Sequence, residues 1–390
     1  MKDFIRAIRD FFVSLKLTVV LLVFGMLLIF AATLDQVNLG VWAVQEKYFR
    51  SFVVYGRFGN IAVPMFPGGY VVGGLLLVNL LAAHIYRFNL KWRKTGIQLA
   101  HSGLILLLLG ELFTGLLQQD FQMKIAQRET VNFAESFRDI ELSIVDATDP
   151  KFDEVVAVPA GLLERGKPIQ HPKLPFRIVP KTYYPNSIVQ MRPETGPASP
   201  ATAGLGPKLM AAPQPVTHRD DERNLPSAFV ELVGSEGSLG TYLVSLHLAR
   251  PQTFEHAGRQ WKIALRVRRI YYPFSLTLNE LRHDVYPGTD IPKNFSSRVQ
   301  LKTADGREDR EVLIFMNNPL RYGGQTFYQY QMDQSSGFTV FQVVRNPSWL
   351  IPYIACTLMT LGLLIQFGIH LVGFVGRRRL AAAKPATSPA

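Results

Sequence analysis

Four long apolar segments do most to constrain what this chain can fold into. They cover residues 17–34, 70–86, 97–118 and 349–375. An α-helix rises ~1.5 Å per residue, so each segment has roughly the length that a helix needs to cross the hydrocarbon core of a bilayer. We therefore expect four transmembrane helices. Small residues at 31–33 leave a cleaved signal peptide as the alternative for the first segment.

The basic residues predict how these helices are oriented. The net charge is +12, and most of the excess falls in residues 1–16, 87–96 and 376–390. Because basic residues are enriched in cytoplasmic loops, we expect these to be a cytoplasmic N-terminus, a cytoplasmic basic loop and a cytoplasmic tail. Residues 35–69 and 119–348 then face the opposite side. Because this excess of basic residues is explained by the orientation of the helices, it does not indicate a nucleic-acid partner.

Residues 119–348 are predicted to form a large extracytoplasmic β-rich domain between the third and fourth helices. Apolar and polar residues alternate in 140–144, 261–267 and 338–344, which is typical of half-buried strands. The domain carries 27 basic and 25 acidic residues and is therefore close to neutral.

A hairpin is predicted inside this domain. Residues 228–233 and 241–248 read as strands, and the segment 234–237 between them contains two glycines.

Two segments are expected to depart from regular structure. Residues 193–216 are rich in proline, alanine, glycine and threonine, which predicts a disordered excursion from the β-rich domain. In the outer loop 35–69, aromatic and charged residues between 36 and 55 suit a helix lying in the membrane interface. An aromatic-rich turn packed on the outer domain is an equal alternative.

Catalytic motifs are missing from the sequence. It contains no P-loop, nucleophile elbow or paired-carboxylate motif, and its single cysteine, Cys356, excludes an internal disulfide or a CxxC exchange. We therefore expect no independent catalytic constellation.

His101 is the leading candidate for a ligand residue. It lies inside the third apolar segment, where an imidazole costs free energy unless a partner satisfies it, so an intramembrane histidine suggests a functional site. A hydrogen bond to a neighbouring helix is the structural alternative.

His84 is a weaker candidate. It lies three residues before Arg87, close to the charged end of its helix, whereas His101 lies seven residues after Lys94, roughly 10 Å deeper than that charge. A pair ligating one metal would then be strained, and His84 could instead reach toward the headgroups. His370 in the last segment is a further possible ligand.

Glycines at 96, 103 and 110 recur every seven residues in the third segment. Such a stripe permits either close helix packing or the approach of a flat ligand. Packing is the favoured reading.

Several short motifs carry a family resemblance. They are residues 14–18, 32–36, 101–110, 123–129, 273–276, 286–289, 318–329 and 346–347. The motif at 318–329, NPLRYGGQTFYQ, is the most specific. On these motifs the chain resembles the ResB (CcsB-type) subunit of the System II cytochrome c biogenesis machinery. Residues 193–216 have no counterpart in it.

The resemblance implies a subunit of a holocytochrome c synthase complex in the bacterial cytoplasmic (inner) membrane. Such a subunit pairs with a CcsA (ResC) type partner, and together they carry haem b outward and attach it to apocytochrome c. It also implies that the third-helix histidine, here His101, is an axial ligand of the haem iron, with the second ligand expected from the partner.

Two other functions remain open from the sequence alone. The chain could be a non-catalytic membrane scaffold whose β-domain assembles another envelope complex. A small-molecule transporter is less favoured, because the spans lack paired intramembrane charges.

Overall fold

The computed structural model describes residues 1–58, 61–87, 91–150, 152–193, 198–217, 223–289 and 291–382. These residues form two compact units. We call the first, built mainly from Met1–Gln118 and Asn346–Ala390, the helical unit. The second, Gln119–Thr217 with Asp221–Arg345, is the β unit.

The helical unit confirms the four expected spans. Its elements are α1 (Lys2–Phe12), α2 (Leu15–Val44), the π-helix η1 (Gln45–Phe49), β1 (Val53–Phe58), β2 (Ile61–Pro67), α3 (Gly69–Arg87), η2 (Trp92–Lys94), α4 (Thr95–Leu117) and α6 (Ile351–Ala382). Four of the helices contain segments long and apolar enough to cross a membrane. These segments are Leu15–Val41, Gly69–Tyr86, Trp92–Leu117 and Ile351–Arg379. The protein is therefore a membrane protein.

Helix α2 runs past the end that its first acidic residue, Asp35, predicts. Two side chains compensate the charge of this carboxylate. Lys47 forms an ion pair with Asp35, and the Tyr48 hydroxyl donates to Asp35 Oδ2 at 2.8 Å. The helical path breaks only at Gly40, where φ is +78°. Beyond this kink a short helical segment, residues 41–49, folds back so that Tyr48 packs against Leu28 and Ala32 of α2. Whether it lies in the membrane interface stays a prediction.

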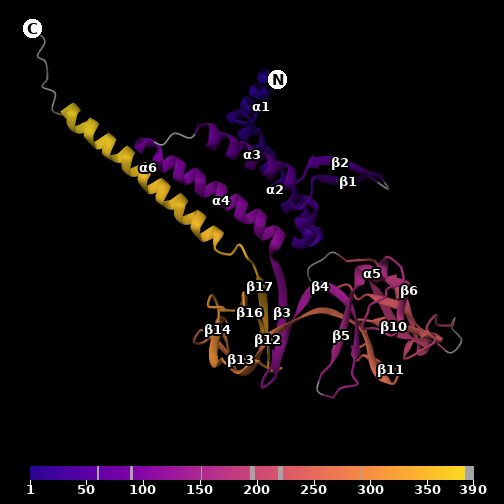
Figure 1. Ribbon diagram of the computed structural model, residues 1–390. Helices are drawn as coiled ribbons and strands as arrows, with labels where there is room; N and C mark the ends of the chain where they lie inside the picture. Colours follow the sequence, from indigo (N-terminus) through magenta and orange to yellow (C-terminus); the bar gives the residue numbers. More distant parts are fainter. Residues whose placement is uncertain are drawn as a thin grey trace, which may run out of the picture. The chain divides into compact units, whose positions relative to one another are not determined.

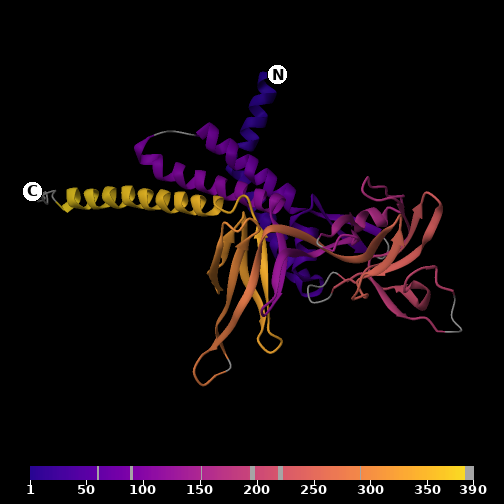
Figure 2. The same cartoon turned by 60° about the horizontal axis from the view of Figure 1, so that its bottom comes forward.

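Helix α4 lies along α6 in both views (Figures 1 and 2). The glycine stripe makes this possible. A Cβ at Gly103 would lie 2.6 Å from Met359 Cγ and 2.8 Å from the carbonyl oxygen of Ala355, and a Cβ at Gly96 would lie 2.6 Å from the carbonyl oxygen of Gly362. The stripe is therefore a helix-packing surface, as favoured from the sequence, and α6 covers it.

The β unit is built almost entirely from antiparallel strands. They are β3 (Gln119–Ala126), β4 (Thr130–Asp146), β5 (Glu154–Pro159), β6 (Arg177–Tyr184), β7 (Ser187–Met191), β8 (Leu209–Pro213), β9 (Ser227–Gly234), β10 (Gly237–Ser245), β11 (Gln252–His256), β12 (Arg259–Val285), β13 (Pro292–Thr303), β14 (Asp309–Phe315), β15 (Leu320–Tyr322), β16 (Gln325–Asp333) and β17 (Phe338–Arg345). The short helix α5 (Ala160–Glu164) follows β5. The expected strands fall in β4, β12 and β17, and the expected hairpin is β9–β10.

Two hydrophobic cores share the long strands β4 and β12. One core packs the early half of β12 and the end of β4 against the sheet β10-β9-β6. The other is enclosed by the run β14-β13-β12-β4-β3-β17-β16-β15. This run of strands curves round the core and brings β13 near β16, where Ser297 donates to Gln329 Oε1 at 2.7 Å.

Part of the segment predicted to be disordered, residues 193–216, has regular structure. Among its described residues are the turn η3 (Gly206–Lys208) and β8, which pairs with β7. Leu209 and Ala211 pack against a small core that includes Phe229 and Leu243. Composition predicted little to bury here, but these few apolar residues find a partner surface on β9 and β10.

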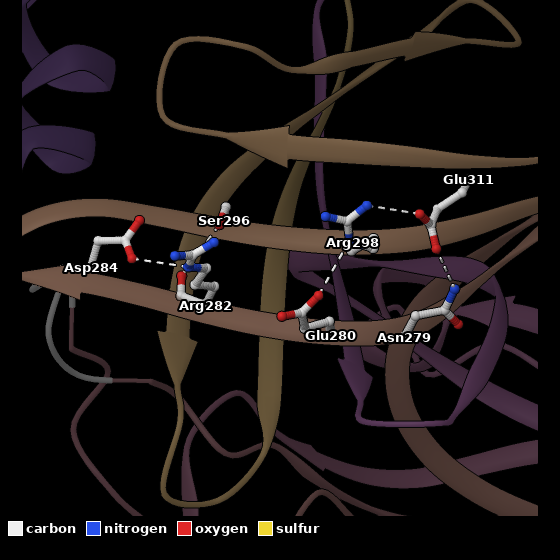
Figure 3. Close-up of polar contacts among 7 residues, drawn as sticks. All are labelled: Asn279, Glu280, Arg282, Asp284, Ser296, Arg298 and Glu311. Carbon is white, nitrogen blue, oxygen red and sulfur yellow. Dashed lines mark hydrogen bonds and ion pairs between the residues drawn. The ribbon is translucent and has the colours of Figure 1, made fainter.

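Charged side chains on β12, β13 and β14 pair across the strands (Figure 3). Arg298 on β13 reaches Glu280 on β12 at 3.3 Å and Glu311 on β14 at 2.9 Å. Within β12, Arg282 reaches Asp284 at 3.1 Å. Such pairing agrees with the near-neutral charge of this unit. It also places charge near the outermost strand β14, which discourages edge-to-edge association.

Candidate functional site

His101 is held by its own helix in a state suited to ligation. Its Nδ1 lies 2.8 Å from the carbonyl oxygen of Ile97, one turn earlier in α4. Because a carbonyl oxygen only accepts, Nδ1 must carry the proton, and the neutral ring then has its lone pair on Nε2. Histidines that bind metals commonly make this kind of second bond, which fixes the tautomer and the ring orientation.

The imidazole lies on the side of α4 away from α6. At ~100° per residue, His101 is rotated by roughly 140–160° from the glycines at 96 and 103 that face α6. Its side chain is exposed in this chain. The glycine stripe therefore cannot form the wall of a ligand route beside His101, whereas a ligand or second subunit could approach its free face.

The structure brings His84 closer to His101 than the sequence predicts. His84 Nε2 lies 3.3 Å from the hydroxyl oxygen of Ser102, the residue after His101. The two imidazoles are also within electrostatic reach of one another. The two histidines are therefore nearer to each other than their expected difference in depth predicts, because α3 and α4 are offset so that residue 84 lies beside residue 102.

His370 lies apart from this pair. Gly362 packs against Ala100 of α4, next to His101, and His370 follows eight residues later, ~12 Å further along the helix axis. Its Nε2 lies 2.8 Å from Gln366 Nε2. His370 therefore cannot share one metal with His101.

The donor set fits haem iron better than a bare metal ion. Among the described residues, no group of three or more His, Cys, Asp or Glu side chains gathers at one place. Protein sites for zinc usually need three or four such ligands. Haem iron needs only axial ligands from the protein, and a single oriented imidazole on an exposed helix face meets that need.

Asn79 is a polar residue in α3 that the sequence analysis missed. It is 1% exposed and its side chain accepts from Thr18 Oγ1 at 2.6 Å. Its Nδ2 donates to the carbonyl oxygens of Phe12 at 2.6 Å and Ser14 at 3.2 Å. An asparagine in an apolar segment is a readable signal, and here it joins α3 to the start of α2.

The entry to the last helix is joined to α4 in a similar way. Asn346 Nδ2 lies 3.2 Å from Thr114 Oγ1, and its Oδ1 accepts from the Ser348 amide at 2.8 Å. Asn346 belongs to the motif at 346–347 that contributed to the family resemblance. Its contacts give this motif a structural role at the start of α6.

Part of the β unit matches a known protein family. Residues 232–337 match the ResB-like family, a range that runs from the end of β9 to the turn after β16. The chain is also 34% identical over 105 residues to Protein NrfI of Wolinella succinogenes. That match spans 27% of this chain and 12% of the relative.

The fold is that of a multi-pass membrane protein. It has four helices long and apolar enough to span a membrane, and one large β-rich domain between the third and the fourth. The family match supports the resemblance seen in the sequence over residues 232–337, which contain the segments 273–276, 286–289 and 318–329. His84 and His101 lie outside residues 232–337, so their role stays a prediction.

Proposed function

We propose that this protein is the haem-handling subunit of a membrane-bound cytochrome c synthase. It would help to carry haem outward through the cytoplasmic membrane and present it for attachment to apocytochrome c. The family match and the similarity to Protein NrfI support a role in cytochrome c biogenesis.

The observation that carries the haem-handling role is the bond from His101 Nδ1 to the Ile97 carbonyl. It leaves Nε2 as the nitrogen available to iron and points to one axial ligand from this chain. Haem, when bound, would supply the vinyl groups that become thioether links to the cytochrome. The Ile97 carbonyl acts on His101 by holding the ring in one orientation.

The second axial ligand is proposed to come from a CcsA (ResC) type partner. His101 is exposed on the face of α4 away from α6, where a second membrane protein can reach it. His84 is the alternative within this chain. The contact between His84 Nε2 and the Ser102 hydroxyl would have to break before that nitrogen could bind iron.

The β unit is proposed to lie on the extracytoplasmic side and to dock the apocytochrome or brace the partner. Residues 232–337, which match the ResB-like family, lie in this unit.

The test is the haem content of the complex purified with its membrane partner. Removing a group that only orients a metal ligand costs ~10–100-fold in affinity, so His101→Ala, which removes the ligand itself, should lower the haem affinity by at least that factor and reduce the Soret absorbance per protein. His370→Ala is the matched control, because it removes another exposed intramembrane histidine and should leave haem content unchanged.

An unchanged Soret band in His101→Ala would favour the alternative function, a scaffold that assembles another envelope complex without touching haem. His84→Ala separates the two histidines. A loss as large as that of His101→Ala would assign the second ligand to this chain, and a small loss would assign it to the partner.

A further inference from the structure

Helix α1 divides its surface sharply into an apolar and a charged face. At ~100° per residue, its five large apolar side chains fall within an arc of about 120°, and its charged residues occupy the opposite side. The apolar face consists of Phe4, Ile5, Ile8, Phe11 and Phe12, and the charged face of Lys2, Asp3, Arg6, Arg9 and Asp10.

The described protein leaves the apolar face of α1 largely uncovered. Phe4 is 70% exposed, Ile5 58% and Phe11 57%, and α1 contains no buried residue. An exposed apolar stripe of this kind, rimmed by charge, marks a surface that binds something.

The position of α1 indicates what covers this face. Only Val13 and Ser14 separate it from α2, whose membrane span begins at Leu15. The Arg9 guanidinium lies 5.8 Å from the ring centroid of Tyr86, the last residue of the next span. Helix α1 therefore lies close to the end of the bundle at which α2 begins and α3 ends.

The chain breaks between α1 and α2. Helix α1 ends at Phe12 and α2 begins at Leu15. Buried Asn79 donates to two main-chain carbonyls at this break, those of Phe12 and Ser14. Helix α1 is thus a separate helix and not a continuation of the first span.

We propose that α1 is an in-plane helix that binds the membrane surface at this end of the bundle. Its apolar face enters the boundary between headgroups and acyl chains, and Lys2, Arg6 and Arg9 contact anionic phospholipid headgroups. Continuity with a membrane span favours lipid over a protein partner, and the basic side chains match anionic headgroups. This proposal is independent of the haem-handling role.

Spin labels on the full-length protein test the proposal. In a Cys356→Ser background, one label is placed through Ile8→Cys at the centre of the apolar face. A matched label is placed through Asp10→Cys, two residues later on the charged face. Both proteins are reconstituted in nanodiscs of phosphatidylcholine and phosphatidylglycerol at a ratio of about 7:3, a surface charged enough to attract basic residues.

The expected result is high oxygen and low nickel-chelate accessibility at position 8, with the reverse at position 10. Equal exposure of both labels to the water-soluble chelate would overturn the proposal, because α1 would then lie in solution. Shielding of position 8 from both reagents would also overturn it, because protein would then cover the apolar face.

Lipid charge gives a second readout. In nanodiscs of phosphatidylcholine alone, chelate accessibility at position 8 should rise by about twofold or more, since each basic residue near an anionic surface adds to binding. No change with lipid charge would overturn the assignment of anionic headgroups as the ligand. Unchanged thermal unfolding of both labelled proteins would confirm that the substitutions leave the fold intact.

Discussion

The hydroxyl of Thr18 in α2 donates to Asn79 Oδ1 in α3 at 2.6 Å. The same asparagine holds the main-chain carbonyls at the break between α1 and α2. One buried amide therefore fixes three segments of the chain at once.

Replacing this amide should destabilise the helical unit. Asn79→Leu removes three hydrogen bonds, those to Thr18, Phe12 and Ser14, at a cost of about 1–3 kcal/mol in the free energy of unfolding. Thr18→Val removes one bond and should cost less. Unfolding in mixed detergent micelles measures both, and equal stability of Asn79→Leu and wild type would contradict this role.

Gly103 and Gly115 of α4 offer a matched pair. A Cβ at Gly103 would lie 2.6 Å from Met359 Cγ and 2.8 Å from the Ala355 carbonyl, whereas none of the described atoms lies within 4 Å of a Cβ at Gly115. Gly103→Ala should therefore destabilise the packing of α4 on α6 by about 1–3 kcal/mol. Gly115→Ala should be neutral or stabilise by up to ~1 kcal/mol. Thermal unfolding checks both, and similar effects at the two sites would count against close packing.

The turn between β15 and β16 depends on two glycines. Gly323 and Gly324 have φ values of +57° and +74°, as a two-residue type I′ hairpin turn requires. Gly324→Ala meets no atom but must adopt a left-handed conformation, which costs roughly 1–2 kcal/mol. Gly324→Asn should cost less, because asparagine tolerates this region. Denaturant unfolding of the full chain would reveal the difference, and equal losses for alanine and asparagine would refute it.

Tyr272 predicts a loss of stability at alkaline pH. Burial among Phe274 and Phe327 raises the pKa of its phenol to about 12, above the usual value near 10. The folded state therefore holds this proton more tightly than the unfolded state, and stability falls as pH rises from about 10 to 12. At pH 11 the loss should be about 1 kcal/mol.

Tyr272→Phe is the control for this effect. It cannot ionise, so the difference in unfolding free energy between wild type and variant should shrink or change in favour of the variant between pH 9 and pH 11. A difference that stays constant over this range would show that Tyr272 is not buried as described.

Much of the fold follows from sequence patterns. The apolar runs gave the spans because length and lack of charge are local properties. The alternation of apolar and polar residues predicted strands such as β17, and the glycines at 234 and 237 predicted the turn of the β9–β10 hairpin. The haem-ligand role of His101 remains a prediction, although its intramembrane position could be read directly.

The misplaced features depend on contacts between distant residues. Asp35 predicts a helix end only until Lys47 and Tyr48 compensate its charge. The segment 193–216 looks disordered until Leu209 meets the small core on β9 and β10. The nearness of His84 to Ser102 depends on how α3 and α4 are offset, which periodicity does not report.

The apolar residues between 2 and 12 recur at helical spacing, a local signal that was not used in predicting the fold from the sequence. Lys2, Arg6 and Arg9 were read only as a topology marker. Their spacing against Phe4 and Ile8 also predicts an amphipathic helix, which the structure confirms.

The most direct test of the account is chemical rescue at His101. In the complex with its membrane partner, His101→Gly should lose its bound haem, and added imidazole should restore the Soret band by replacing the missing ring. His370→Gly should retain haem without imidazole. Full haem content and an unaltered spectrum in His101→Gly would contradict the claim that this histidine ligates iron.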